Sequence, residues 1–437
     1  MRGKWEEVTI GALLARDGGS IKTGPFGTAL KAKEYSATGV PLISVGEVGY
    51  GSLQVHEKTP RVPQAVVDRL PEYVLESGDI VFGRKGAVDR CALVKPYQAG
   101  WFLGSDGIRL RLPETVDPRF IAFQLQSPGT RAWLVQHATG TTMPSLNQAI
   151  IERIPLRIPP LHQQRAIAQV LGTLDDKIEL NRRMSETLEA MARALFKSWF
   201  VDFDPVRAKA EGRDPGLPKP LADLFPARLV DSELGEIPEG WEVGTLGDVA
   251  ESPRRSLQPH EISADTAYIA LEHMPRRCIA LSDWVSGDGI ASNKFEFKRG
   301  EILFGKLRPY FHKVGVAPID GVCSTDIVVI SPQEPDWFAF VLGLVSSDEF
   351  VEFTNAGSTG TKMPRTSWGD MARYELANPP RSIAKAFTDL MRPAVERMIS
   401  GIHESRTLAA LRDALLPKLI SGEMRVKEAE KFIGRVA

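Results

Sequence analysis

Apolar residues recur every seven positions in the middle of the chain. One seam is formed by five residues spaced by seven: Ile167, Leu174, Asn181, Leu188 and Leu195. A second seam of the same heptad is formed by Val170, Lys177, Met184 and Met191. Heptads of this kind are typical of helices that pair side by side through two seam positions. The pattern predicts a helix of about 40 residues, roughly 60 Å long at 1.5 Å per residue.

A second stretch near the end of the chain carries a similar series. Its apolar members are Phe387, Leu390, Val395, Met398, Ile402, Leu408, Leu411 and Leu415. Pro393 and Gly401 interrupt the series, and we expect them to kink or weaken the helix. Two such helices pair most simply with each other, whereas the alternative makes them core helices of two compact domains. The interface expected between them consists of Ile167, Val170, Leu174, Leu188, Met191, Leu195, Phe387, Leu390, Leu408, Leu411 and Leu415.

Short apolar runs punctuated by Gly and Pro precede each helical stretch. Runs such as Ile80-Val81-Phe82 and Ile302-Leu303-Phe304 are typical of strands, and a few short helical patterns lie between them. An α+β module therefore fits each globular part. The intervening segment 202–240 is dense in Pro, Gly and charge, which predicts a linker.

The two halves of the chain repeat one another. Gly78–Arg84 returns as Gly300–Lys306, and Thr139–Pro144 returns 220 residues later as Thr359–Pro364. Pro159-Pro160 recurs at the same offset as Pro379-Pro380. Several separated matches in one order indicate an internal duplication. The expected organisation is a first domain (1–160), a central helix (161–201), a linker (202–240), a second domain (241–380), a distal helix (381–421) and a C-terminal tail (422–437).

Composition excludes several other classes of protein. The 437 residues are 43% apolar and 25% charged, which is ordinary for globular chains. No apolar stretch approaches the roughly 18 residues of a membrane span, and the N-terminus lacks the apolar core of a secretory signal, so we expect a cytoplasmic protein. Three cysteines, Cys91, Cys278 and Cys323, lie far apart and predict buried apolar positions instead of disulfides or zinc ligands.

Candidate catalytic motifs have weak support. Asn378-Pro379-Pro380-Arg381 resembles a methyltransferase loop without its aromatic residue, and it aligns with the Pro-Pro hinge of the first copy. Gly357–Lys362 lacks the Gly-Lys-Ser/Thr order of a phosphate-binding loop. Asp79 and Glu301 could be nuclease carboxylates, but duplicated residues ahead of a buried strand favour turn or cap positions. Seven scattered histidines form no metal-binding motif. We therefore expect neither catalysis nor a metal site in this chain.

The motifs together resemble the specificity subunits of type I restriction-modification enzymes. The resemblance rests on Leu234–Glu242, the Gly-Asp/Glu-Ile-Val/Leu-Phe-Gly core, the Thr-Gly-Thr…Met-Pro element, and Pro159-Pro160-Leu161 before a long helix. It implies two target-recognition domains separated by two long antiparallel helices, each domain reading half of a bipartite double-stranded DNA site. It also implies methyltransferase and restriction (helicase-nuclease) subunits as partners. S-adenosylmethionine, Mg²⁺ and ATP would be bound by those partners, and this chain would bind no cofactor.

DNA contact requires cationic or amide side chains for phosphates and base edges. Residues 1–160 hold 19 Lys and Arg against 15 Asp and Glu, whereas residues 231–380 hold 13 against 23. The second domain is therefore acidic overall, although Lys294, Lys298 and Arg299 add to its local cations. Polar loops at corresponding places in the two copies supply the candidate DNA-binding residues: Arg84, Lys85, Arg90, Thr141, Thr142, Ser145, Asn147, Lys306, Arg308, Lys313, Lys362 and Arg365.

Two other functions stay open at this point. A scaffold or adaptor could use the same helices to bind proteins without reading DNA. A nuclease or methyltransferase in its own right is a third, weaker hypothesis. Genes for a methyltransferase and a helicase-nuclease beside this one would favour the DNA-reading function, and a lone gene would favour the adaptor.

Overall fold

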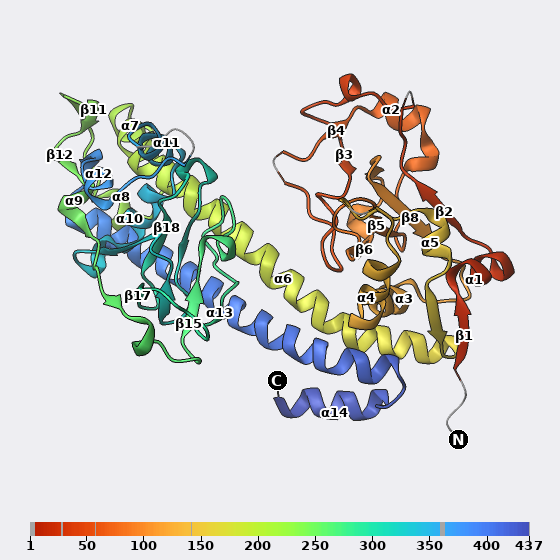
Figure 1. The fold of residues 1–437 in the computed structure, drawn as a ribbon. Coiled ribbons are helices and arrows are strands. Elements are labelled where there is room, and N and C mark those ends of the chain that lie inside the picture. The colour runs from red at the N-terminus through yellow and green to blue at the C-terminus, as the bar shows by residue number, and fades with distance from the viewer. Residues whose placement is uncertain (1–4, 28, 57, 141, 359–362, 437) are drawn as a thin grey trace. The chain divides into compact units, whose positions relative to one another are not determined.

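A computed structural model describes residues 5–27, 29–56, 58–140, 142–358 and 363–436. The chain forms two compact units, one built from Met1–Asp176 with Leu408–Ala437 and the other from Lys177–Thr407. Each unit combines an α+β domain with parts of two long helices (Figure 1). The expected fold class, two α+β domains linked by long helices, is confirmed.

The first domain is built on an antiparallel sheet of order β2-β8-β5-β6. Its strands are β2 (Ser20–Thr23), β8 (Gly107–Arg111), β5 (Ile80–Gly83) and β6 (Cys91–Leu93). A second sheet has the order β4-β3-β7, with β4 (Arg61–Val62), β3 (Val40–Ile43) and β7 (Phe102–Leu103), and β1 (Glu6–Thr9) pairs with β9 (Pro155–Ile158). The α-helices of this domain are α1 (Ile10–Asp17), α2 (Gln64–Arg69), α3 (Pro118–Gln126), α4 (Pro128–His137) and α5 (Gln148–Glu152).

The second domain repeats this plan with the sheet β13-β21-β18-β19. Its strands are β13 (Ala250–Glu251), β21 (Ile327–Pro332), β18 (Ile302–Gly305) and β19 (Val314–Val316). A five-stranded sheet contains β14 (Ser256–Leu257), β17 (Lys294–Phe297), β20 (Gly321–Cys323), β15 (Ala267–Ile269) and β16 (Val285–Ser286), and β12 (Glu242–Thr245) pairs with β22 (Glu375–Asn378). The α-helices are α9 (Leu246–Val249), α10 (Phe338–Val345), α11 (Asp348–Ala356) and α12 (Trp368–Met371).

The long helices are α6 (Leu161–Phe200) and α13 (Arg381–Ile420). In the second unit they run antiparallel, because Asn181 contacts Gly401 while Phe196 contacts Phe387. Asn181 is 3% exposed, and its Nδ2 donates to the Gly401 carbonyl (3.4 Å), Glu404 Oε2 (2.8 Å) and Ser405 Oγ (3.2 Å). The expected polar seam position is thus a buried hydrogen-bonding site between the helices.

Two residues expected in the helix interface do not lie there. Met191 is 56% exposed and Leu390 is 43% exposed. A straight α-helix drifts by about 20° per heptad, so a seam counted strictly in sevens leaves the buried face. Along α6 the seam that contains the buried Val170 accordingly moves by one position, so that Ala192, which is partly buried, replaces the exposed Met191. The other expected interface residues are buried or partly buried in the two main cores: Ile167, Val170, Leu174, Leu188, Leu195, Phe387, Leu408, Leu411 and Leu415.

The expected interruption of the distal helix is also absent, since α13 is continuous through Pro393 and Gly401. Pro393 and Asp389 lie on the exposed face, where water can bond the carbonyl that proline leaves without a donor. Gly401 faces Asn181, whose side-chain atoms would lie 3.6 Å from a Cβ at that glycine. Solvent exposure and close helix packing therefore accommodate both residues.

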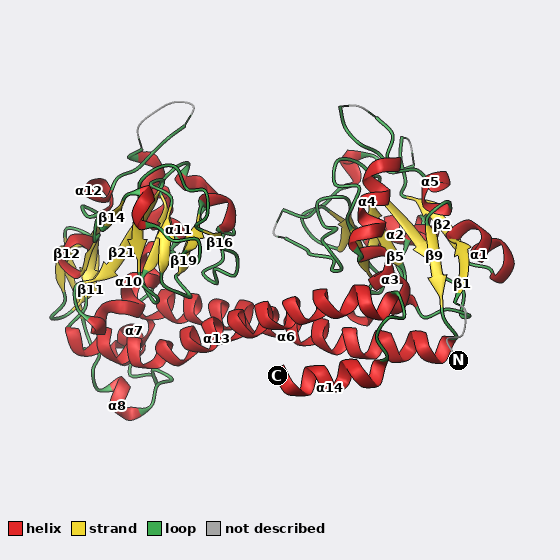
Figure 2. Ribbon diagram, turned by 60° about the horizontal axis from the view of Figure 1, so that its bottom comes forward, coloured by secondary structure: helices red, strands yellow, loops and turns green. Residues whose placement is uncertain are grey.

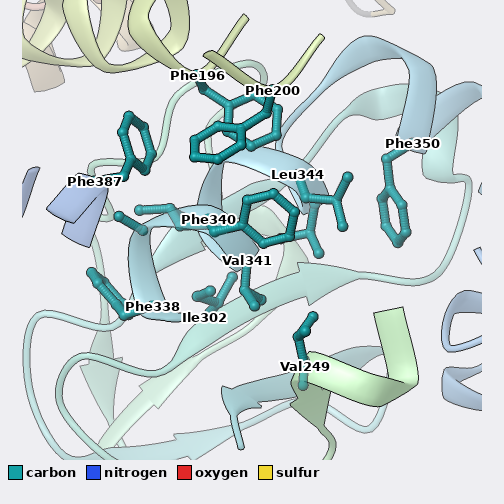
Figure 3. Close-up of a cluster of buried hydrophobic side chains, with 14 of the residues drawn as sticks. Phe196, Phe200, Val249, Ile302, Phe338, Phe340, Val341, Leu344, Phe350 and Phe387 are labelled. Atoms are coloured by element: carbon teal, nitrogen blue, oxygen red, sulfur yellow. The ribbon is translucent and has the colours of Figure 1, made fainter. Parts of the chain in front are cut away.

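An aromatic cluster joins α6 and α13 to the second domain. The ring of Phe200 lies 4.9 Å from Phe340 of α10 and 5.0 Å from Phe387 of α13, and Phe196 lies beside both of these rings (Figure 3). Aromatic pairs in this range contribute about 0.5–1.5 kcal/mol beyond the burial of their area. The end of the central helix is therefore fixed in the core of the unit.

The segment 202–240, expected as a linker, is folded onto the same core. It contains α7 (Asp204–Ala210), α8 (Lys219–Ala222) and the hairpin of β10 (Leu229–Ser232) and β11 (Gly235–Pro238). Phe203 and Phe225 are buried, with Phe225 packed edge-on against Trp199 at 5.1 Å. These two apolar rings stabilise a segment that Pro, Gly and charge otherwise mark as a loop.

The C-terminal segment, expected as a tail, forms α14 (Val426–Val436). This helix lies alongside the last part of α13 (Figure 2), and Ala429 is buried in the first core together with Leu415 and Leu419. In the part of the chain that the structure describes, no helix is both long and apolar enough to cross a membrane.

Candidate nucleic-acid interface

Four loops of the first domain meet at one end of its main sheet. The register pairs Gly83 with Gly107 and Thr23 with Ile108, so β2 and β5 end where β8 begins. The opposite end of the sheet lies against α6, where Lys95 and Arg119 contact Asp176 at 3.7 and 2.7 Å. We call the loops away from α6, residues 24–27, 84–90, 104–106 and 139–147, the first loop edge.

Backbone hydrogen bonds hold these loops together. Arg84 N donates to the Asp106 carbonyl (2.8 Å), and the Arg84 carbonyl accepts from Leu146 N (2.8 Å). Gly86 N donates to the Pro144 carbonyl, also at 2.8 Å. The loop of the β5–β6 hairpin and the Thr-Gly element therefore form one surface, although about 60 residues of sequence separate them.

The second domain repeats the same bonds. Lys306 N donates to the Asp326 carbonyl (3.0 Å), and the Lys306 carbonyl accepts from Thr366 N (3.1 Å). Arg308 N donates to the Pro364 carbonyl (2.8 Å), as Gly86 does to Pro144. The duplication thus preserves the geometry of two loops, and residues 306–313, 324–326 and 363–366 form the second loop edge.

Cationic side chains of both loop edges lie beside a carboxylate. Lys85 Nζ is 3.5 Å from Asp106, and Arg365 Nη2 is 3.3 Å from Asp326. The two cations are 47% and 55% exposed, so an anion can approach them from solvent. Exposed ion pairs of this kind contribute at most about 1 kcal/mol, so a phosphate could compete with the carboxylate.

Arg308 has a left-handed backbone. Its φ is 52°, and the corresponding position of the first domain is Gly86 with a φ of 76°. A non-glycine residue in this region costs roughly 1 kcal/mol or more, and such strain is concentrated at functional sites. Its side chain is half-buried, and the guanidinium lies 5.9 Å from the centre of the Phe311 ring at the second loop edge.

Two other residues predicted to contact DNA have structural roles. Asn147 Oδ1 accepts from Ile150 N at 2.9 Å and caps α5. Lys313 Nζ donates to the Leu271 carbonyl, and burial lowers the pKa of this lysine. Both are therefore less available to a ligand than sequence reasoning assumed. Thr142 is exposed, while Ser145 pairs through its backbone with Thr139.

Thr141 and Lys362 lie outside the described residues. Arg90 stays at the first loop edge, where its carbonyl accepts from Gly83 N at 3.1 Å.

Three further cations of the second domain do not belong to the loop edge. Arg299 pairs with Glu396 of α13, and Lys298 pairs with Glu296, at the end of β18 that faces the long helix. Lys294 is 8% exposed, with Nζ bonded to Ser292. The lysines and arginines that lie close together in the sequence are therefore distributed between the two ends of the sheet.

Two contacts between arginines and aromatic rings were not predicted from the sequence. The guanidinium of Arg131 lies 4.1 Å from the centre of the Tyr50 ring, and Asp89 bonds both Arg131 (2.8 Å) and the Tyr50 hydroxyl (2.9 Å). In the second domain Arg276 lies 4.0 Å from the centre of the Phe311 ring. No spacing in the sequence links these residues, because they come from different loops.

The carboxylates considered as nuclease residues support turns. Asp79 Oδ2 accepts from Glu76 N at 2.7 Å, and Glu301 Oε2 accepts from Lys298 N at the same distance. Asp79 also pairs with Arg111 at 2.8 Å. Both residues therefore have the turn role expected from the duplication. Across the described ranges, no group of three or more His, Cys, Asp or Glu side chains could hold a metal ion.

The cysteines are unpaired thiols among the residues described. Cys91 and Cys323 are buried, as expected, and Cys278 is partly buried. Burial raises the pKa of each thiol to about 12, so the thiolate is scarce at neutral pH.

Comparisons with known proteins agree with the duplicated architecture. Residues 3–190 match the family model of the type I restriction modification DNA specificity domain. The type I restriction enzyme MjaIX specificity subunit of Methanocaldococcus jannaschii is 25% identical over 411 residues, covering 91% of this chain and 90% of that protein. The HindI specificity subunit of Haemophilus influenzae is 24% identical over 70% of this chain and 77% of its own length.

A solved structure shares the fold. The S subunit of a type I restriction-modification system from M. genitalium matches with a TM-score of 0.54 and 15% identity, over 95% of this chain and 96% of that one. This match concerns the fold, and the sequence match to the MjaIX subunit extends over both copies of the repeat. Residues 3–190 thus match the type I restriction modification DNA specificity domain, and nearly the whole chain is similar to specificity subunits of type I restriction enzymes.

Proposed function

We propose that this chain reads a bipartite sequence in double-stranded DNA, with one half-site bound by each loop edge. The observation that carries the proposal is the repeated pair of hydrogen bonds at Arg84 and Gly86 and at Lys306 and Arg308. Two equivalent cation-bearing surfaces in one chain suit two half-sites on one duplex. Their cations would neutralise phosphates, while polar side chains in the grooves would read the bases.

The carboxylates of the second domain are compatible with this role. Four carboxylates of the range 231–380, Asp231, Glu233, Glu236 and Glu239, precede the second domain in the β10–β11 hairpin and the turn after it, and Glu242 begins β12. These elements belong to neither of the larger sheets of the domain. Net charge therefore describes the second domain less well than the local charge of its loop edge.

The long helices would set the spacer between the half-sites and bind the methyltransferase subunits. Restriction subunits would complete the assembly in the cytoplasm. In this proposal the chain itself is not catalytic, and the partner subunits bind S-adenosylmethionine, Mg²⁺ and ATP. The relatives described above are specificity subunits of type I restriction enzymes, which supports a role as the specificity subunit of a larger enzyme.

Mapping of methylated bases tests the proposed function. Cells that produce this chain with its methyltransferase partners should carry methylation at a single sequence made of two short blocks and a nonspecific spacer. Cells that lack only this chain should show none at that sequence. Methylation that is identical with and without the chain would contradict the proposal and favour an adaptor role.

A salt titration tests the cations of the second loop edge. Lys306→Gln with Arg308→Gln should weaken DNA binding by the assembled enzyme and lower the slope of log K against log salt by about 1.8, because each lost phosphate contact removes about 0.9. Glutamine keeps most of the side-chain length, so packing changes little.

Lys298→Gln with Arg299→Gln provides the matched control, because it removes two cations from the opposite end of the same strand. This control should leave the slope unchanged. Equal slopes for the two double variants would show that the loop edge does not meet phosphates.

A further inference from the structure

Phe26 has the largest exposed fraction, 69%, of the large apolar side chains in the described part of the chain. It lies in the run Thr23-Gly24-Pro25-Phe26-Gly27, directly after β2. The first loop edge therefore presents a phenyl ring to solvent. Burying such a ring against a partner is favourable, because it removes apolar surface from water.

The base of this loop is fixed to its neighbours. Gly24 N donates to the Gly107 carbonyl at 3.0 Å, and a Cβ on Gly24 would lie 1.8 Å from the Gly104 carbonyl oxygen. Gln148 Nε2 of α5 donates to Thr23 Oγ1 at 3.2 Å. Backbone contact this close requires glycine. The loop is thus held to the β7–β8 loop through its backbone and to α5 through Gln148.

The ring is also held near its exposed position by the local backbone. Proline fixes φ at residue 25, and Gly27 has a φ of 67°, which favours glycine. Ala29 N donates to the Phe26 carbonyl at 3.4 Å, which closes the turn. A pinned turn loses little conformational entropy when its side chain meets a partner.

Two cations lie beside the base of the loop that carries Phe26. Arg84 Nη1 donates to the Ser105 carbonyl at 3.2 Å, one residue from the Gly104 that packs against Gly24. Lys85 lies next to Arg84 and is 47% exposed. A protruding apolar ring beside cations suits a duplex, because phosphates meet the cations while the ring unstacks a base step.

We infer that Phe26 inserts against the bases of the first half-site as an apolar wedge. The inference rests on the proposed function and adds a residue that distorts DNA to the cations of the first loop edge. In the second domain, Ser252-Pro253-Arg254-Arg255 follows the corresponding strand β13 and carries no aromatic ring. The exposed aromatic ring of the second loop edge, Tyr310, lies on a different loop. The distortion by Phe26 is therefore expected at the half-site of the first domain.

The test uses the assembled enzyme and duplexes with 2-aminopurine placed at successive positions of both half-sites. Binding should raise the fluorescence at one step of the first half-site, where the base becomes unstacked. Phe26→Ala should abolish that rise and weaken binding about tenfold, given the usual contribution of aromatic stacking on a base. The salt slope should not change, because no charge is removed.

Tyr97→Ala is the matched control, since Tyr97 is 49% exposed and follows β6 at the opposite end of the sheet. It should leave both fluorescence and affinity unchanged. Phe26→Leu should restore part of the rise, because leucine also acts as a wedge. Equal melting temperatures of the variants would establish that they remain folded.

The possible failures differ from one another. If the wild-type assembly shows no sequence-specific binding, the proposed function is wrong and the wedge with it. If it binds specifically but no first-half position brightens, or Phe26→Ala binds as tightly as wild type, only the wedge is overturned. A rise confined to the second half-site would likewise overturn it.

Discussion

Adding one heptad to each long helix should lengthen the nonspecific spacer of the DNA target by about three base pairs. Seven residues extend a helix by about 10.5 Å, and stacked base pairs are about 3.4 Å apart. The insertions belong after Asp176 in α6 and after Thr407 in α13, where the chain passes between its compact units. Both half-site sequences should persist, because neither loop edge is altered.

The structure decides where such insertions can be placed. A site near Lys197 lies between Phe196 and Trp199, and both rings are packed in the aromatic core. An insertion there would displace Phe200 from Phe340 and Phe387. Loss of a buried aromatic contact set of this size costs about 3–5 kcal/mol.

Insertion into α6 alone is the control for paired lengthening. It would put the pair Lys177–Glu404 (3.4 Å), on one side of the insertion, out of register with the pair Asp175–Arg412 (2.7 Å) on the other side. We therefore expect this variant to assemble poorly. Methylation mapping gives the readout: a folded, active double insertion with an unchanged spacer would exclude the helices as the ruler.

Sequence reasoning succeeded where the repeat itself carried the information. The offset of 220 residues places Asn181 and Gly401 at equivalent positions, and in the structure these residues face each other. The paired loops of each domain also follow from the duplicated Gly-Asp/Glu-Ile and Thr-Gly elements. A long helix and a repeated motif are local features, and local features are visible in a sequence.

Properties that depend on three-dimensional packing could not be predicted in this way. Met191 and Leu390 fit the heptad, but the drift of an α-helix turns them outward. Lys313 directly precedes strand β19 as Arg90 precedes β6, yet its ammonium is bonded to the carbonyl of Leu271, 42 residues earlier. The exposure of Phe26 had no signal either, because a single phenylalanine in a loop is ordinarily a core residue.

Exchange of the second domain for that of a relative should replace one half-site completely and leave the other intact. The structure places the exchange points at Glu242 and Asn378, the ends of the β12–β22 pair, so that the donor supplies both paired strands. Trp241 stays with the recipient, because its ring contacts Phe200 at 6.0 Å and Phe203 at 5.5 Å.

The face of the donor domain that packs on α6 and α13 must still fit these two retained helices. Phe340 of α10 packs on Phe196 and Phe200, so the chimaera should keep an aromatic residue at that position. A matched chimaera with alanine there should lose stability while its loop edge remains that of the donor. Mapping the methylation directed by the first chimaera then tests whether each domain determines one half-site by itself. A change in both half-sites, in an assembly that is folded and active, would show that the two loop edges do not read DNA independently.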